Sequence, residues 1–429
     1  MKIADINAKI ILDSRRKETI EVGLRAADFL SKASVPSGKS RGRHEAFVLE
    51  PRQAMEKLSE IKPLILSASA GGRIENQRDF DNFLISLDAS ENKENLGGNL
   101  ILALSLAFAR LKAKSENLEL FEYIRDNFQL PITLLRSNSP KGHYKLPRPI
   151  FNVINGGAHS AQPKSRLAFQ EFQVIPTLND FKIAFAVGKE FYFKLGNVLD
   201  KRFGADVRLG DEAGYSAPFK NNEEALEVLY ELILKHRYPL KIGLDAAASQ
   251  FYKSDAAGKK SKKTQGFYLI DGKQIAAAEL KDLYASMVRA YDIVSIEDPF
   301  EEESFEDFAD LLARTSAQTE EKILIIADDL TVTNSKRLKT AIDKKSGNAI
   351  LIKPNQIGTL TETLDVVELA RQNGWQSVVS HRSGETMDDF IADLAVGVGA
   401  WGVKAGAPAK EERLAKYDRL LEISQKILQ

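Results

Sequence analysis

Six short apolar runs in the second half of the chain each end on a charged or ionisable residue, and this regularity constrains the fold more than any other feature. The runs are KIGLD, IVSIED, ILIIADD, AILIK, SVVSHR and WGVK, which end at Asp245, Glu297, Asp328, Lys353, His381 with Arg382, and Lys404. Helical patterns alternate with the runs, which indicates parallel strands joined by crossover helices. In a closed parallel barrel the carboxyl ends of all strands meet at one rim, where active sites lie. We therefore expect an α/β barrel that gathers these side chains at its rim.

A single charge at a strand end marks no more than the exit of that strand into solvent. The run AILIK makes the stronger case, because a lysine at the edge of a core is costly unless it has a partner. Six such ends in register, mixing acids and bases, favour a shared functional site over six independent exits.

The first part of the chain follows a different pattern. Ile20, Val22 and Leu24 alternate with polar residues, and the polar cluster at 13–19 predicts a turn, so we expect an antiparallel meander. A Gly/Ser/Lys loop at 36–42 and helical stretches such as 98–116 follow. A proline-rich segment is the expected linker. These patterns predict an N-terminal α+β domain over residues 1–140 and a barrel domain over residues 141–429.

Composition excludes several classes of protein. A chain of 429 residues is longer than one hydrophobic core usually serves, so we expect two domains. Its 60 basic and 60 acidic side chains cancel, so the net charge is zero. We therefore expect no nucleic-acid or membrane partner, and we interpret the lysine-rich segment 253–266 as a solvated loop. The absence of cysteine excludes disulfides, thiolate metal sites and a cysteine nucleophile. With no export signal or membrane-length apolar run, the expected location is the cytoplasm.

Three of the strand-end residues are carboxylates. Asp245, Glu297 and Asp328 would form the hard, all-oxygen site that Mg²⁺ prefers, although Asp329 could replace its neighbour. Each carboxylate taken alone could instead cap a helix or form a salt bridge. Lys353 on the next strand would stand beside the cation, whose charge should lower the lysine pKa from about 10.4 and make it a general base. This pair suggests removal of a proton from carbon.

Other residues at the rim suit an anionic substrate. Arg382 and Ser383, together with the distant loop 37–42, offer a fork of donors and hydroxyls for a phosphate group. Lys404 offers a point charge for a carboxylate.

Eight motifs carry a resemblance to one family. They are FNVINGGAH, QEF, LGDEAG, SIEDPF, ADDLTVTN, LIKPNQIG, SHRSGET and the GAP of KAGAP. In this order they resemble the enolase family over almost the whole chain, from ILDSR at 11–15 to ERLAKY at 412–417. The resemblance implies an N-terminal α+β domain followed by a modified eight-stranded TIM-type barrel. It also implies a homodimer with two Mg²⁺ ions per site that dehydrates 2-phospho-D-glycerate to phosphoenolpyruvate.

The resemblance also implies a role for individual residues. The catalytic residues would be Lys353, Glu212, Glu171 and His381. The substrate contacts would be His159, Arg382, Ser383, Lys404 and Ser40, and the metal ligands would be Asp245, Glu297, Asp328 and Ser40. Lys353 would take the C2 proton, and Glu212, supported by Glu171, would help the C3 hydroxyl leave. We expect the pKa of Glu212 to be raised by burial or by Asp211, because the acid and the base of an elimination need pKa values pushed apart.

The chain departs from the family pattern in several loops. Residues 16–18 replace a Gly-Asn-Pro turn, and Arg41 replaces a threonine in the loop that carries Ser40. Ala213 stands in place of a glycine, which matters if that backbone needs a positive φ, and Gln250 stands where a glutamate is common. These changes predict an altered rate through loop closure.

Two other functions fit the same sequence. A dehydratase of the same superfamily acting on an unphosphorylated acid would share the metal and the base but would have no need for Arg382, Ser383 and Ser40. A non-catalytic enolase-like binding protein would fold without turnover. Dependence on the substrate phosphate separates the first alternative from the enolase reaction, and turnover separates the second.

Overall fold

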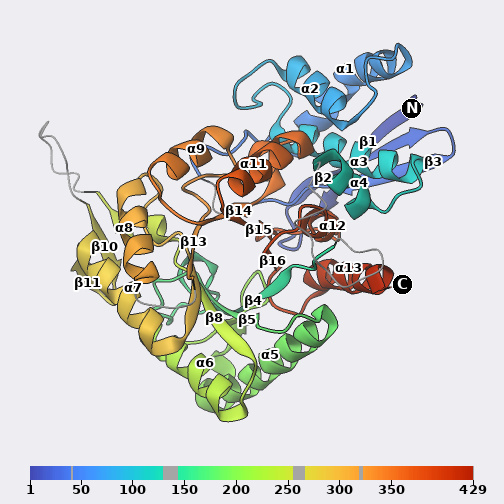
Figure 1. The fold of residues 1–429 in the computed structure, drawn as a ribbon. Coiled ribbons are helices and arrows are strands. Elements are labelled where there is room, and N and C mark those ends of the chain that lie inside the picture. The colour runs from blue at the N-terminus through green and yellow to red at the C-terminus, as the bar shows by residue number, and fades with distance from the viewer. Residues whose placement is uncertain (40–41, 129–143, 255–265, 318–321, 429) are drawn as a thin grey trace, which may run out of the picture.

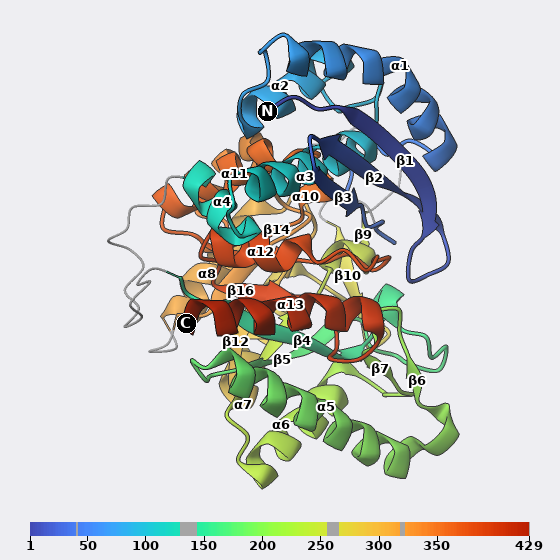
Figure 2. The same ribbon diagram turned by 90° about the vertical axis from the view of Figure 1, so that its right-hand side faces the viewer.

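The computed structural model describes residues 1–39, 42–128, 144–254, 266–317 and 322–428. Its N-terminal part is an antiparallel three-stranded sheet covered by helices, which confirms the meander predicted from the alternating pattern. The strands are β1 (Asp5–Leu12), β2 (Glu18–Ala26) and β3 (Phe29–Ser34), and the helices are α1 (Pro51–Ala70), α2 (Gln77–Asp88), α3 (Gly98–Ser115) and α4 (Leu120–Phe128). Helix α3 is buried along most of its length because it lies between this sheet and the barrel. Figure 2 shows this part in blue and teal, in the upper half of the view.

The turn between β1 and β2 uses an unusual residue. Arg16 has a φ of 60°, the left-handed conformation that glycine adopts most easily. The Asp13 carboxylate accepts hydrogen bonds from the backbone N–H groups of Arg15 at 2.8 Å and Lys17 at 2.9 Å. The chain thus keeps a left-handed turn here without a glycine, because an aspartate side chain holds the backbone.

The second part is a closed barrel of eight strands, in which the strand order returns from β16 to β4. The strands are β4 (Arg148–Asn155), β5 (Glu171–Pro176), β8 (Leu240–Asp245), β12 (Ile293–Glu297), β13 (Leu324–Ala327), β14 (Ala349–Ile352), β15 (Gln376–Ser380) and β16 (Gly402–Lys404). The barrel strands β8, β12, β13, β14, β15 and β16 pair in parallel, which confirms all six predicted runs. Strand β5 is antiparallel to both of its neighbours. Its first residues, rather than its last, therefore lie at the rim.

Helices surround the barrel strands, as Figure 1 shows. They are α5 (Phe181–Phe203), α6 (Asn222–His236), α7 (Ala277–Tyr291), α8 (Phe305–Ser316), α9 (Ser335–Asp343), α10 (Pro354–Ile357), α11 (Leu360–Gln372), α12 (Phe390–Gly397) and α13 (Glu411–Leu428). Shorter elements are strands β6 (Arg208–Leu209), β7 (Tyr215–Ser216), β9 (Tyr252–Lys253), β10 (Phe267–Ile270) and β11 (Lys273–Ile275), with 3₁₀ turns at Gly157–His159, Gly204–Asp206 and Ala248–Gln250.

Strand β14 explains why an apolar run ends on a lysine. Ala349 and Leu351 belong to a small apolar cluster inside the barrel, whereas Ile350 and Ile352 belong to the main core. Because successive side chains of a strand point to opposite faces, Lys353 continues the inward series. Its ammonium group therefore enters the barrel mouth rather than the surrounding solvent.

The two parts pack against each other through buried polar contacts as well as apolar ones. The Asp81 carboxylate on α2 accepts the backbone N–H of Thr361 at 2.9 Å, and Ser105 on α3 accepts that of Leu360 at 2.9 Å. Both N–H groups lie at the start of α11, which would otherwise bury unpaired donors. This contact fixes the N-terminal domain relative to the barrel rim.

Two expectations concern segments that are only partly described. The proposed domain boundary at residue 140 lies in 129–143, and most of the lysine-rich segment lies in 255–265, so both fall outside the described residues. The division into domains at 140 therefore stays a prediction. In the part of the chain that the structure describes, no helix is long and apolar enough to cross a membrane.

Candidate active site

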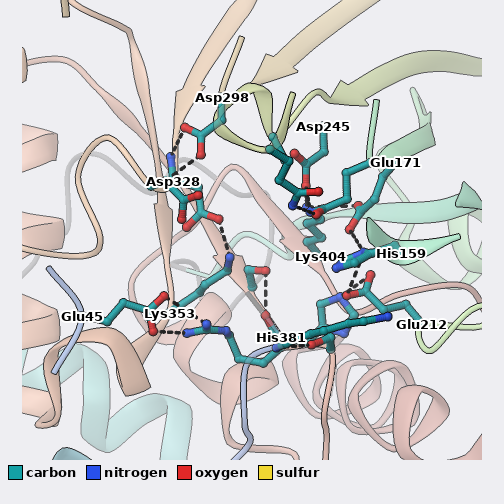
Figure 3. Close-up of a pocket in the computed structure, with 18 residues that line it drawn as sticks. Glu45, His159, Glu171, Glu212, Asp245, Asp298, Asp328, Lys353, His381 and Lys404 are labelled. Atoms are coloured by element: carbon teal, nitrogen blue, oxygen red, sulfur yellow. Dashed lines mark hydrogen bonds and ion pairs between the residues drawn. The ribbon is translucent and has the colours of Figure 1, made fainter. Parts of the chain in front are cut away.

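A pocket at the carboxyl end of the barrel strands brings together most of the predicted site residues. The predicted residues that line it are His159, Glu171, Glu212, Asp245, Asp328, Lys353, His381, Arg382, Ser383 and Lys404. Figure 3 shows Lys353 and Asp328 on one side of this pocket, and His159, Glu171 and Glu212 on the other. Glu297 contacts the pocket residue Lys404. Ser40 lies outside the described residues.

Lys404 lies among three carboxylates. Its Nζ is 2.9 Å from an oxygen of Asp245, 2.9 Å from Glu297 and 3.0 Å from Glu171. Burial opposes the charge of Lys404, but these carboxylates outweigh burial and hold its pKa well above the usual value. The residue at the end of β16 is therefore a fixed positive charge in the middle of the pocket.

The lysine proposed as the base is paired with a predicted metal ligand. Lys353 Nζ forms an ion pair with the Asp328 carboxylate, whose other oxygen accepts from Gln356 Nε2 at 3.1 Å. Burial is the largest effect and lowers the pKa of Lys353, but Asp328 and Glu297 together hold it above its usual value. The expectation of a lowered pKa depends on the charge of a metal ion, and it stays a prediction.

Glu212 is held between two histidines on the opposite side of the pocket. Its Oε1 is 3.6 Å from His159 Nδ1, and its Oε2 is 3.3 Å from His381 Nε2. Asn152 Nδ2 also donates to Oε2 at 2.9 Å. His159, His381 and Asn152 together fix the position of the Glu212 carboxylate.

The expected rise in the pKa of Glu212 is wrong for this arrangement. Burial does raise it, but His381, His159 and Arg413 together hold the pKa well below the usual value. Asp211, the neighbour expected to raise it, instead faces Lys39 at 3.3 Å. The raised pKa belongs to Glu171, because burial is the largest effect there and Glu212 adds to it, while Lys404 opposes both.

Glu171 and Glu212 share a contact with one histidine. His159 Nδ1 is 3.5 Å from Glu171 Oε1 and 3.6 Å from Glu212 Oε1. Two carboxyl groups whose environments push their pKa values apart are typical of acid–base sites. Glu171, with its raised pKa, can therefore hold a proton close to Glu212, whose pKa is low.

The predicted phosphate contacts meet a residue that sequence reasoning missed. Both terminal nitrogens of Arg382 lie 3.0 Å from the carboxylate of Glu45, and one of them also donates to Asn355 at 3.0 Å. Ser383 Oγ accepts the backbone N–H of Lys39 at 2.8 Å. Glu45 follows no strand, and the only sequence signal was an acid within a basic loop.

The donor set of the pocket fits a hard cation. Among the described lining residues, seven carboxylates face three lysines and one arginine. Burial, and after it the charge of Asp245, raises the pKa of Glu297 well above its usual value, because neighbouring carboxylates at these strand ends repel one another. Carboxylate oxygens without sulfur ligands suit Mg²⁺. A bound cation would relieve this repulsion.

The close groups of potential ligands differ from the predicted set. Two groups of described residues bring three ligand atoms within 4.8 Å of one another; they are His159, Glu171 and Glu212, and Asp298, Asp328 and Asp329. The set Asp245, Glu297 and Asp328 is not one of them; Lys404 pairs with Asp245 and Glu297, and Lys353 pairs with Asp328. Burial, with Asp328 next, raises the pKa of Asp329 to about 7, and the alternative that Asp329 is a ligand stays open.

Two of the departures from the family pattern lie at this pocket. Ala213, directly after Glu212, has a φ of 66°, so its backbone does adopt the conformation that favours glycine. Tyr192 donates to its carbonyl oxygen at 2.7 Å. Gln250 lines the pocket, accepts the backbone N–H of Ala158 at 3.3 Å, and bonds to Gln170. Arg41 lies outside the described residues.

A closed barrel with acids and lysines at its strand ends, joined to an α+β domain that covers part of the rim, defines a class of barrel enzymes. Family models described as "Enolase, N-terminal domain" and "Enolase, C-terminal TIM barrel domain" match residues 3–124 and 143–429. The chain belongs to the enolase family, the phosphopyruvate hydratases.

Curated proteins named "Enolase" are similar over the whole chain. Those of Methanosarcina barkeri and Corynebacterium kroppenstedtii are each 40% identical, and that of Methanococcoides burtonii is 39% identical. The matches cover 99% of this chain and 94%, 95% and 95% of the three relatives respectively. The similarity therefore spans both parts of the molecule.

Proposed function

We propose that the protein dehydrates 2-phospho-D-glycerate to phosphoenolpyruvate with Mg²⁺. The observation that carries this proposal is the opposed placement of a lysine and a pair of carboxyl groups across one pocket, in a chain of the enolase family. A β-elimination needs a base and an acid on different sides of the substrate.

The two chemical steps follow from this placement. Lys353 Nζ, in its neutral form, takes the proton from C2 of the substrate. The electrons left on C2 form the C2–C3 double bond as the bond from C3 to its hydroxyl breaks. Glu212, in its protonated form, gives a proton to that hydroxyl, which leaves as water. Because the pKa of Glu212 is low in this arrangement, its proton must come from a neighbour, and Glu171, with its raised pKa and shared contact with His159, is placed to supply it.

Two Mg²⁺ ions would supply positive charge that stabilises negative charge on the substrate carboxylate. Asp245, Glu297 and Asp328 would hold the first ion and Ser40 the second. The substrate phosphate would engage Arg382 and Ser383, so Arg382 would exchange part of its contact with Glu45 for the ligand. Lys404 would meet the substrate carboxylate, and His381 and His159 would lie against the substrate.

The test is the absorbance of phosphoenolpyruvate formed from 2-phosphoglycerate by the purified protein, with Mg²⁺ and then with EDTA. Product that appears only with Mg²⁺ supports the proposal. A folded, Mg²⁺-binding protein that forms no product would contradict it. Turnover of an unphosphorylated acid would then favour another dehydratase, and no turnover at all a binding protein.

The assembly and the location belong to the same proposal. Family membership supports a homodimer in the cytoplasm, with a phosphorylated small acid as the ligand. Sedimentation velocity across a range of protein concentrations tests the assembly. A single species at the mass of one chain, 47.6 kDa, would contradict the dimer.

A further inference from the structure

Arg413, in the first turn of α13, is fully buried against the acid side of the pocket, with 0% of its surface exposed. Arginine is rarely buried to this extent unless its donors are paired. Its terminal nitrogens donate to the carbonyl oxygens of Arg382 at 2.7 Å, Ser383 at 2.6 Å and Asp211 at 3.3 Å. One side chain thus ties the loop after β15 to the loop that carries Glu212.

A fourth contact of Arg413 determines the state of a histidine. Arg413 Nη1 lies 2.6 Å from His381 Nδ1. A guanidinium group has only donors, so His381 Nδ1 must accept and carries no proton. The single proton of neutral His381 is then on Nε2, which faces Glu212 Oε2 at 3.3 Å. Burial lowers the pKa of His381 to about 4, which agrees with a neutral ring.

We infer that Arg413 is a positioning residue for the reaction, which fixes His381 as the tautomer with its proton on Nε2 and so prevents it from taking the proton of Glu212. This inference rests on the proposed role of Glu212 as the acid. With Nδ1 bound by Arg413 and Nε2 already protonated, His381 has no basic nitrogen left. The proton on Glu212 can then leave only toward the substrate hydroxyl or back to Glu171 by way of His159.

The second histidine at Glu212 makes the inference specific. His159 turns Nδ1 toward Glu171 and Glu212, and a proton on this nitrogen can be donated to either carboxylate. The two histidines on either side of Glu212 therefore differ at Nδ1. Arg413 causes this difference, because His159 has carboxyl groups at the position where His381 has a guanidinium group.

Nitrogen NMR of the whole protein with ¹⁵N-labelled histidine tests the inference without turnover. The chain has five histidines, so the signals of His381 and His159 can be assigned by their loss in His381→Asn and His159→Asn. We expect a non-protonated Nδ1 and a protonated Nε2 for His381, and a protonated Nδ1 for His159. A proton on Nδ1 of His381 would overturn the inference, whether or not the enzyme turns over.

Substitutions then separate positioning from stability. Glutamine at 413 can accept as well as donate, so in Arg413→Gln we expect His381 to populate both tautomers and kcat to fall about 10²-fold, with KM little changed. Exchange of the substrate C2 hydrogen with D₂O should persist, because it needs the base Lys353 but not the acid Glu212. Arg413→Lys keeps a group that only donates and should restore the tautomer and part of kcat.

Arg419→Gln is the matched control on the same helix. Arg419 pairs with Asp393 at 2.7 Å and Glu119 at 3.0 Å, away from the pocket. We expect this variant to lower the melting temperature and to leave kcat and the His381 signals unchanged. If folded Arg413→Gln keeps the wild-type tautomer and kcat, Arg413 is only structural and the inference fails. If the wild-type protein does not exchange the C2 hydrogen at all, the result counts against the proposed function instead.

Discussion

The two sides of the pocket are built in different ways. The base side consists of Lys353 and Asp328, which directly follow two neighbouring parallel strands, β14 and β13. The acid side consists of Glu212 on a loop, Glu171 at the start of the one reversed strand, and Arg413 on the last helix. A regular barrel supplies one side, and contacts between irregular segments supply the other. The base therefore depends on strand register, whereas the acid depends on hydrogen bonds between loops.

The largest effect should come from the base side. Lys353→Ala removes the group that takes the C2 proton, so we expect both dehydration and C2–deuterium exchange to fall by about 10³-fold or more. The measurement is steady-state formation of phosphoenolpyruvate together with NMR of substrate recovered from D₂O. Lys353→Met, which keeps the length of the side chain, is the control for lost packing. Near-normal exchange in either variant would contradict the assignment of the base.

A substitution on the acid side should separate removal of the C2 proton from loss of the C3 hydroxyl. Glu212→Gln keeps the shape and the contact with Asn152 but cannot donate an acidic proton, so we expect dehydration to fall about 10²- to 10³-fold while C2 exchange continues. The ratio of exchange to dehydration measures this directly. An equal loss of both rates would mean that Glu212 does not act in a step of its own, and the comparison of the two sides would fail.

The same contrast shows what could be predicted from the sequence. The alternation of short apolar runs with helical patterns placed Lys353 and Lys404 at one rim, because the carboxyl ends of parallel strands in a closed barrel meet there. No such rule leads to Glu45, Arg413 or the low pKa of Glu212, since these depend on which loops meet after folding. Glu212 and Glu171 were found only through the family resemblance. The reversed strand β5 also has no local signal, because a buried strand reads alike in both directions.

The affinity for Mg²⁺ should depend on the carboxylates in the centre of the pocket, between the base side and the acid side. Asp245→Asn keeps the size of the side chain and removes one negative charge, so we expect the Mg²⁺ concentration for half-maximal activity to rise about tenfold or more, equivalent to ~1.4 kcal/mol. Titration of Mg²⁺ at saturating substrate measures this. Asp298→Asn is the comparison variant. It also removes one carboxylate of the pocket, but Asp298 accepts the backbone N–H groups of Asp328 and Asp329 and is not a proposed ligand. An unchanged Mg²⁺ requirement in Asp245→Asn would place the ligand elsewhere.

The smallest expected effect concerns the backbone of the acid loop. Ala213 and Ala217 are both fully buried, but only Ala213 has a positive φ. Replacing either with glycine removes a buried methyl group and adds freedom to the unfolded chain, and both changes cost stability. Only Ala213→Gly also relieves the left-handed strain, worth roughly 1–2 kcal/mol. We therefore expect Ala213→Gly to be more stable than Ala217→Gly by about 1 kcal/mol in urea unfolding. Equal midpoints with equal slopes would show that the Tyr192 hydrogen bond and the packing around this loop already absorb the strain, and that the glycine of other family members is not needed here for stability.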